Sequence, residues 1–166
     1  MHTESGLFFA NECPHLTGKI EGLISSLGYE TTLPVNMMKP KDYLSMSNTN
    51  AISGFELKRQ LIRKKCFNDK SSLVFMASVM WIVGQMGKVG CYSSKGALIS
   101  GMRAMALELV SYGIKVNSIL PSVCKTHLIE RMFSKLSSEK TEEITKMQSL
   151  GPGDPEDVAL AAVYLW

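Results

Sequence analysis

Three side chains whose types suit carbonyl chemistry lie within one short stretch of the sequence. Ser78 follows the apolar run of residues 72–77, Lys95 comes 17 positions later, and Tyr92 lies three positions before Lys95. A serine hydroxyl can hold a carbonyl oxygen, and a phenol can pass a proton to that oxygen when a nearby ammonium lowers its pKa. This spacing therefore favours a site for carbonyl or alcohol chemistry.

The elements that must bring these side chains together alternate between strand and helix. Short apolar runs predict three strands, and helix formers predict four helices. The predicted strands cover residues 22–26, 72–77 and 114–120, and the predicted helices cover residues 42–65, 94–111, 127–148 and 154–166. We expect Asp154 to cap the last helix. The alternation indicates a parallel α/β sheet, which binds ligands at the carboxyl ends of its strands.

The helix predicted over residues 42–65 has two different sides. Phe55 and Ile62 belong to an apolar side that should face the core, and Lys58 and Arg59 are assigned to the solvated side. Residues 29–39 are expected to form a loop, and residues 1–18 an irregular start with at most one short helix.

Length and composition exclude several classes of protein. The 166 residues fit one domain, and a hydrophobic content of 45% predicts a packed core. A net charge of +3, with scattered basic residues, does not predict nucleic-acid binding. No apolar run is long enough to span a membrane, and no secretory signal is visible. The cysteines and histidines show no metal-ligand spacing, so we expect no metal site and a reduced, cytoplasmic setting.

The stretch from residue 72 to residue 126 resembles the catalytic core of the short-chain dehydrogenase/reductase family, particularly members similar to 3-oxoacyl-carrier-protein reductases. It contains SLVFMASV at 72–79, CYSSKGAL at 91–98 and VNSILPSVCKT at 116–126. Outside it, GLISSLG at 22–28, SNTNAISG at 47–54 and GPGDPEDVALAAVYL at 151–165 resemble further family segments. The resemblance implies a single partial Rossmann-like domain over residues 1–166. The similarity to the family begins at about residue 20. Its doubly wound parallel sheet would keep three strands, equivalent to the fourth, fifth and sixth of the family.

The resemblance also implies an NAD(P)-dependent oxidoreductase that interconverts a carbonyl and an alcohol. Ser78 would bind the substrate oxygen, and Asn50 and Lys95 would support proton transfer. The proton donor would be Tyr92 or, with a much shorter side chain, Cys91, which stands where the family has its tyrosine. One step along a helix is a rotation of about 100° and a rise of about 1.5 Å, so Tyr92 should not point where the family's phenol points. We therefore predict impaired catalysis.

Further residues are implied as contacts of an NAD or NADP cofactor. They are Ser26, Gly28, Pro121, Thr126 and Lys95, with Lys95 on the nicotinamide ribose and Thr126 on the carboxamide. The family's glycine-rich pyrophosphate loop has one partial match, over residues 17–24. We interpret this match as chance because a strand, rather than a helix, is predicted to follow it. The resemblance thus predicts a relative shortened at both ends, without the cofactor-loop half.

Two functions therefore stay open at the level of the sequence. The first is an impaired oxidoreductase with a small carbonyl or alcohol substrate. The second is a non-catalytic homologue that acts at most as an oligomerisation or interaction module. Helices 42–65 and 94–111 correspond to those that form the family's dimer interface, so we expect a homo-oligomer.

Overall fold

A three-stranded parallel sheet organises the protein, whose computed structural model describes residues 18–166. The predicted irregular start, and the first residue of the 17–24 match, lie outside the described residues. The strands are β1 (Ile20–Ser25), β2 (Phe67–Met76) and β3 (Lys115–Ile119), in the order β1-β2-β3. Leu23 pairs with Leu73, which pairs with Val116. The predicted α/β, partial Rossmann-like fold is confirmed, and β1 begins within the 17–24 match, so no helix follows that match directly.

The second strand is longer than predicted. It begins at Phe67 instead of residue 72, because Phe67 pairs with Ile20 ahead of an irregularity in the β1–β2 register. Residues 68–70 are polar and largely exposed, so no apolar run indicated that they belong to the strand. Lys70 adopts a positive φ of 65° in this stretch.

The first predicted helix is divided into three consecutive parts. They are α2 (Pro40–Ser47), a π-helical segment η1 (Asn48–Ile52) and α3 (Ser53–Arg63). The following helix, α5 (Val89–Leu109), starts five residues before its predicted start at residue 94. Gly90 lies within α5, and the methyl groups of Met38 and Met46 occupy the space that a side chain at this position would need.

The remaining helical segments differ from the expectation in number and in length. A short α4 (Met80–Val83) and a 3-10 turn η2 (Val110–Tyr112) flank α5. The single helix predicted over residues 127–148 was wrong: α6 (His127–Phe133) and α7 (Ser138–Lys146) replace it, since Ser137 caps α7 by accepting the Lys140 N–H. Helix α8 (Pro155–Tyr164) directly follows Asp154, which is its N-cap as predicted.

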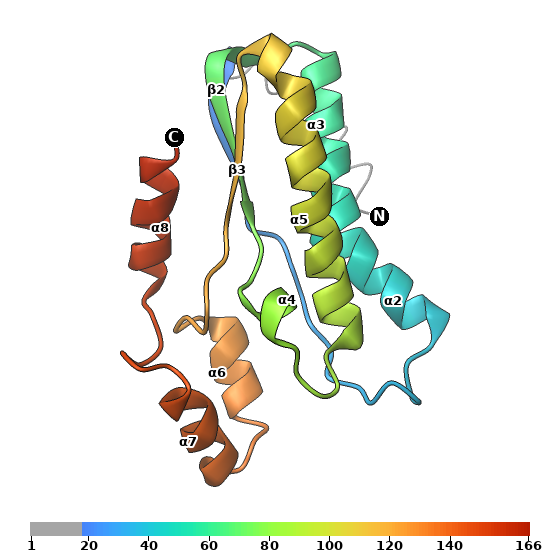
Figure 1. The fold of residues 1–166 in the computed structure, drawn as a ribbon, viewed down its shortest axis with the longest axis vertical. Helices are drawn as coiled ribbons and strands as arrows, with labels where there is room; N and C mark the ends of the chain where they lie inside the picture. The colour runs from blue at the N-terminus through green and yellow to red at the C-terminus, as the bar shows by residue number, and fades with distance from the viewer. Residues whose placement is uncertain (1–17) are drawn as a thin grey trace.

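Helices cover both faces of the sheet. In Figure 1, α3 and α5 lie side by side on one face, α8 lies on the other, and α6 and α7 extend beyond the lower end of the strands. The main core lies between the sheet and the α3–α5 layer, where Leu73 and Phe75 of β2, and Ala77 directly after it, meet Leu98 and Ile99 of α5. These side chains are shielded from water, so their burial stabilises the packing of α5 on the sheet.

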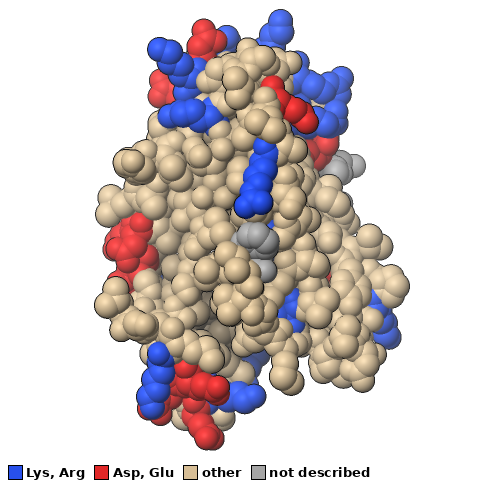
Figure 2. Space-filling model, viewed as in Figure 1, with Lys and Arg blue, Asp and Glu red and all other residues tan. Residues whose placement is uncertain are grey.

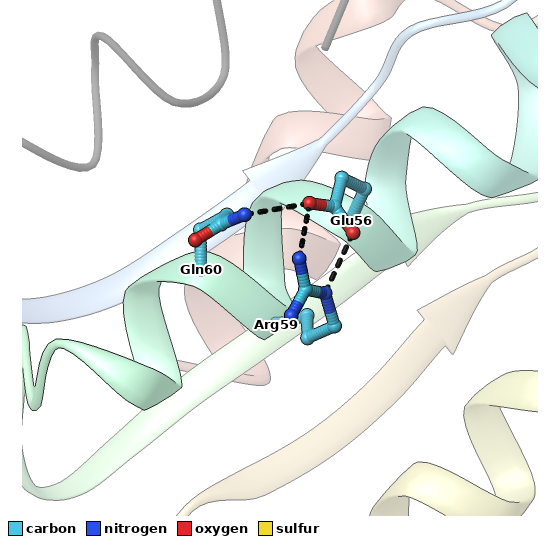
Figure 3. Close-up of polar contacts among 3 residues, drawn as sticks. All are labelled: Glu56, Arg59 and Gln60. Carbon is cyan, nitrogen blue, oxygen red and sulfur yellow. Dashed lines mark hydrogen bonds and ion pairs between the residues drawn. The ribbon is translucent and has the colours of Figure 1, made fainter.

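One residue of α3 contradicts the sequence analysis. Lys58, assigned to the solvated side, is fully buried, with its Nζ 4.0 Å from the centroid of the Phe75 ring. Arg59, by contrast, is solvated: it donates to both carboxylate oxygens of Glu56 at 2.7 Å, and Gln60 donates to the same carboxylate (Figure 3). These bonds, chiefly those from Arg59, lower the pKa of Glu56 to about 2. Adjacent residues of α3 thus meet opposite environments.

Candidate active site

The ends of β2 and β3 are joined at the sheet's carboxyl edge, which places Ser78 there. The Ala77 N–H donates to the Ile119 carbonyl at 2.9 Å, and the Val79 N–H donates to the Pro121 carbonyl at 3.1 Å. Between these two bonds, the Ser78 Oγ accepts the Met80 N–H at 3.2 Å. Since the hydroxyl accepts in this bond, its own hydrogen is available to a ligand oxygen.

Lys95 reaches the same edge from the second turn of α5. Its Nζ donates to the Met76 carbonyl at 3.0 Å, and desolvation lowers the pKa of the ammonium, a shift that Cys91 opposes. A Cβ added to Gly28 would lie 3.3 Å from the Lys95 Nζ and 3.4 Å from the Asn50 Oδ1. The bare backbone of Gly28 therefore forms a small cradle facing Lys95 and Asn50.

Asn50 is held rigidly beside this cradle. It lies in the π-helical segment η1, 3% exposed, and its amide makes three hydrogen bonds. The Oδ1 accepts the Tyr29 N–H at 2.8 Å, and the Nδ2 donates to the Tyr29 carbonyl at 3.0 Å and to the Ser94 Oγ at 2.9 Å. Single π-turns within helices are frequent at functional sites. This one links the loop after β1 to α5 through one side chain.

Replacing Asn50 by alanine is expected to lower the free energy of unfolding by about 2–3 kcal/mol, because buried partners lose their hydrogen bonds. Urea denaturation measures this change. Asn36→Ala, at an exposed loop position, is the matched control and should change stability by less than about 0.5 kcal/mol. Equal effects of the two substitutions would contradict a structural role for the Asn50 network.

The two candidate proton donors, Tyr92 and Cys91, lie near the start of α5 and both have raised pKa values. The Tyr92 hydroxyl donates to the Gln85 Oε1 at 3.0 Å. Burial, with the Cys91 and Glu30 charges, raises the pKa of Tyr92 to about 12, so the lowering expected from a nearby ammonium is absent. Cys91 is 7% exposed, and burial, with Glu30, also raises the pKa of its thiol, which Lys95 and Lys88 oppose. Both groups thus keep their protons at neutral pH.

The other predicted cofactor contacts are more dispersed. Ser26 is exposed, directly after β1, and Pro121 joins the ends of β2 and β3 through its carbonyl. Thr126 is the N-cap of α6 and accepts the Ile129 N–H at 3.5 Å. These three residues follow β1 and β3, whereas Asn50 and Lys95 both lie close to the backbone of Gly28.

Sequence reasoning missed four residues that surround the site. Ser94 and Tyr29 hold Asn50, and Lys88 forms an ion pair with Glu30 at 2.6 Å. Two surface pockets of about 460 and 520 Å³ lie elsewhere, one beside Trp166 and the start of β2, the other beside Gly113 and the start of β3. Neither pocket is lined by Gly28, Asn50, Ser78 or Lys95. The candidate site is therefore this cluster of residues and not one of the two pockets.

Residues 18–166 contain neither a membrane-spanning helix nor a group of metal ligands. None of the helices there combines the length and the apolar character that a membrane crossing requires. The same residues contain no group of three or more His, Cys, Asp or Glu side chains that could hold a metal ion.

The parallel sheet, with serine, lysine and asparagine near its carboxyl edge, defines a partial Rossmann-like fold with a polar cluster where such folds bind ligands. A family model described as enoyl-(acyl carrier protein) reductase matches residues 9–166. A 3-oxoacyl-[acyl-carrier-protein] reductase of Rickettsia bellii is 30% identical over 158 residues, which cover 93% of this chain and 64% of that protein. One from Buchnera aphidicola subsp. Acyrthosiphon pisum is 32% identical over 147 residues, or 88% of this chain and 59% of that protein.

The fold comparison agrees with these matches. The ligand-free aldohexose dehydrogenase of Thermoplasma acidophilum is similar with a TM-score of 0.87, covering 98% of this chain and 67% of that chain, at 17% identity. The protein belongs to the short-chain dehydrogenase/reductase family of oxidoreductases. It spans about 64% of the length of the Rickettsia relatives that it matches.

Proposed function

We propose that this chain carries the site of an NAD(P)-dependent carbonyl–alcohol oxidoreductase whose proton-transfer step is impaired. The observation that carries the proposal is the cradle formed by Gly28, Asn50 and Lys95, next to two donor groups that hold their protons. The names of the relatives favour a 3-oxoacyl thioester as the carbonyl substrate. We also place the protein in the cytoplasm, as its composition predicts.

The residues present fit a nicotinamide nucleotide at the cradle. A glycine lets a flat or sugar-like group approach the backbone closely, and Lys95 offers a charged donor there. When bound, the cofactor supplies the hydride. Lys95 and Gly28 would hold its ribose side, while Ser26, Pro121 and Thr126 would contact it along the ends of β1 and β3. Whether it is NAD or NADP is decided by residues outside this cluster.

Ser78 would orient the substrate, because its hydroxyl hydrogen is available to a carbonyl oxygen. Proton transfer is the impaired step. The Tyr92 hydroxyl is directed to Gln85, and a donor with a pKa of about 12 is poorly matched to a neutral operating pH. Cys91 stands four residues before Lys95 but is buried and short, so it would donate only to an oxygen that enters the cluster deeply.

A second candidate function is a non-catalytic oligomerisation module. Its support is the number of large apolar side chains exposed on the helices, among them Leu44, Ile52, Leu107 and Val110. Figure 2 shows charged side chains concentrated at the two ends of one face and sparse between them. Exposed apolar side chains of this kind favour contact with a second copy of the chain, which we assign to α2, α3 and α5.

Titration of the purified chain with NADH and NADPH, followed by nicotinamide fluorescence, separates the two functions. We expect weak, saturable binding, with a Kd of roughly 1 mM, that Lys95→Met weakens at least tenfold. Lys146→Met, in an exposed ion pair of α7, is the matched control and should bind like the wild type. No binding at millimolar cofactor would overturn the oxidoreductase proposal in favour of the module.

A further inference from the structure

A largely buried ion pair lies beside the candidate site. The Lys88 Nζ contacts the Glu30 Oε1 at 2.6 Å, and the side chains are 6% and 25% exposed. The two residues are 58 positions apart in the chain. Charges shielded from water interact more strongly than surface charges, and removing one partner leaves the other charge uncompensated. This pair therefore differs from the exposed ion pairs of α3 and α7.

The pair joins the loop after β1 to the beginning of α5. Lys88 directly precedes α5, and its carbonyl accepts the Tyr92 N–H at 2.9 Å. Glu30 comes two residues after Gly28 of the cradle. A second bond lies nearby, since the Leu33 N–H donates to the Gly87 carbonyl at 2.9 Å. The loop is thus fixed to the segment that positions the first turn of α5.

That first turn carries both candidate donors. Three charged groups act on Cys91: Glu30 favours its neutral thiol, whereas Lys95 and Lys88 favour its thiolate. Cys91 in turn favours the protonated form of Tyr92, its neighbour on the helix. Glu30 also favours the protonated form of Tyr92. The two members of the ion pair therefore act on Cys91 with opposite signs.

We propose that Glu30 and Lys88 are positioning residues of the candidate site: their ion pair fixes the loop of residues 26–33 against the first turn of α5 and sets the balance of charge at Cys91 and Tyr92. The inference rests on the proposed function, because it assigns these two residues to the same site. It deepens that function by naming what controls the protonation of the donors. Neither residue needs to touch a substrate for this role.

The test measures the ionisation of the Cys91 thiol in the absence of cofactor and substrate. The chain is labelled with 13C at cysteine Cβ, the Cys91 signal is assigned by its loss in Cys91→Ser, and its chemical shift is followed against pH. Glu30→Gln should lower the apparent pKa of Cys91 by about one unit, and Lys88→Met should raise it by a similar amount. Lys88→Arg, which keeps the charge, should restore the wild-type value, and Glu142→Gln of the exposed α7 pair should have no effect.

Opposite shifts in the two variants support the proposal. Shifts of the same sign, or no shift in either variant, would overturn it, because loosening of the structure alone moves a buried thiol toward its ordinary pKa in both. If Glu30→Gln does not fold, Lys88→Met and Lys88→Arg decide by themselves. The measurement involves no cofactor, so a chain that fails to bind NADH or NADPH still gives a result here.

Discussion

Replacing Lys58 by methionine is expected to stabilise the protein by about 4 kcal/mol at pH 7, measured as the free energy of unfolding in urea. Lys58 is fully buried, and its Nζ is the only buried side-chain nitrogen or oxygen among the described residues without a hydrogen-bond partner. Burial lowers its pKa from 10.5 to about 7. Each unit of this shift corresponds to about 1.4 kcal/mol, and the Phe75 ring, which attracts the ammonium, offsets part of the total.

The buried Lys58 also determines how the free energy of unfolding changes with pH. The unfolded chain binds the Lys58 proton up to about pH 10.5, whereas the folded chain releases it near pH 7. Wild-type stability should therefore rise between these two pH values, and the difference from Lys58→Met should shrink toward zero near pH 10.5. Lys41→Met, at an exposed position of α2, is the control and should leave the pH profile unchanged. A constant difference between pH 7 and 10.5 would contradict a buried, displaced pKa.

Moving the phenol by one residue is expected to have the largest effect on activity. In Cys91→Tyr with Tyr92→Ser, a tyrosine stands four residues before Lys95, on the helix face that now carries Cys91. A donor misplaced by about 1 Å can cost a hundredfold in rate, so restoring its position should raise turnover by about a hundredfold. The measurement is NADPH oxidation with a 3-oxoacyl thioester, at saturating cofactor.

The single substitutions are the matched controls for this experiment. Tyr92→Ser alone should leave turnover at or below the wild-type level, and Cys91→Tyr alone should account for most of the increase. Cofactor affinity is measured on the same samples. If the double variant binds cofactor like the wild type and turns over no faster, the displacement of the phenol is not the cause of impairment.

The layout of the fold follows from local features of the sequence. Continuous apolar runs predicted all three strands, and Asp154 followed by Pro155 predicted the start of α8. The break between α6 and α7 also had a local signal, because Ser137 is a favoured N-cap residue, but helix formers on both sides obscured it. The predicted boundaries of strands and helices were wrong where contacts between distant residues determine them. The start of β2 is an example, because Phe67 is extended through its pairing with Ile20.

Lys58 shows how residue type misled the prediction for α3. It lies three residues after Phe55 and three before Leu61, so helical periodicity alone places it on the buried side. The lysine side chain was nevertheless assigned to water, since a lysine is rarely buried without a partner. The aromatic ring of Phe75, on a distant strand, provides the environment that made the assignment wrong.

The candidate site was only partly accessible from the sequence. Ser78 and Lys95 were identified by spacing, and the structure brings both to the end of β2. The orientation of Tyr92 toward Gln85 and the Glu30–Lys88 pair depend on how loops pack, and no pattern in the chain indicates them. The π-helical turn that positions Asn50 likewise has no signal in residue type.

We expect the Tyr92 phenol, three residues before Lys95 in the chain, not to be activated. The most direct test is a spectrophotometric titration of tyrosine ionisation at 295 nm, comparing the wild type with Tyr92→Phe. With a pKa of about 12 for Tyr92, the two curves should coincide up to about pH 10.5. A tyrosine that titrates below about pH 9 in the wild type and is missing in Tyr92→Phe would show an activated phenol and contradict the account.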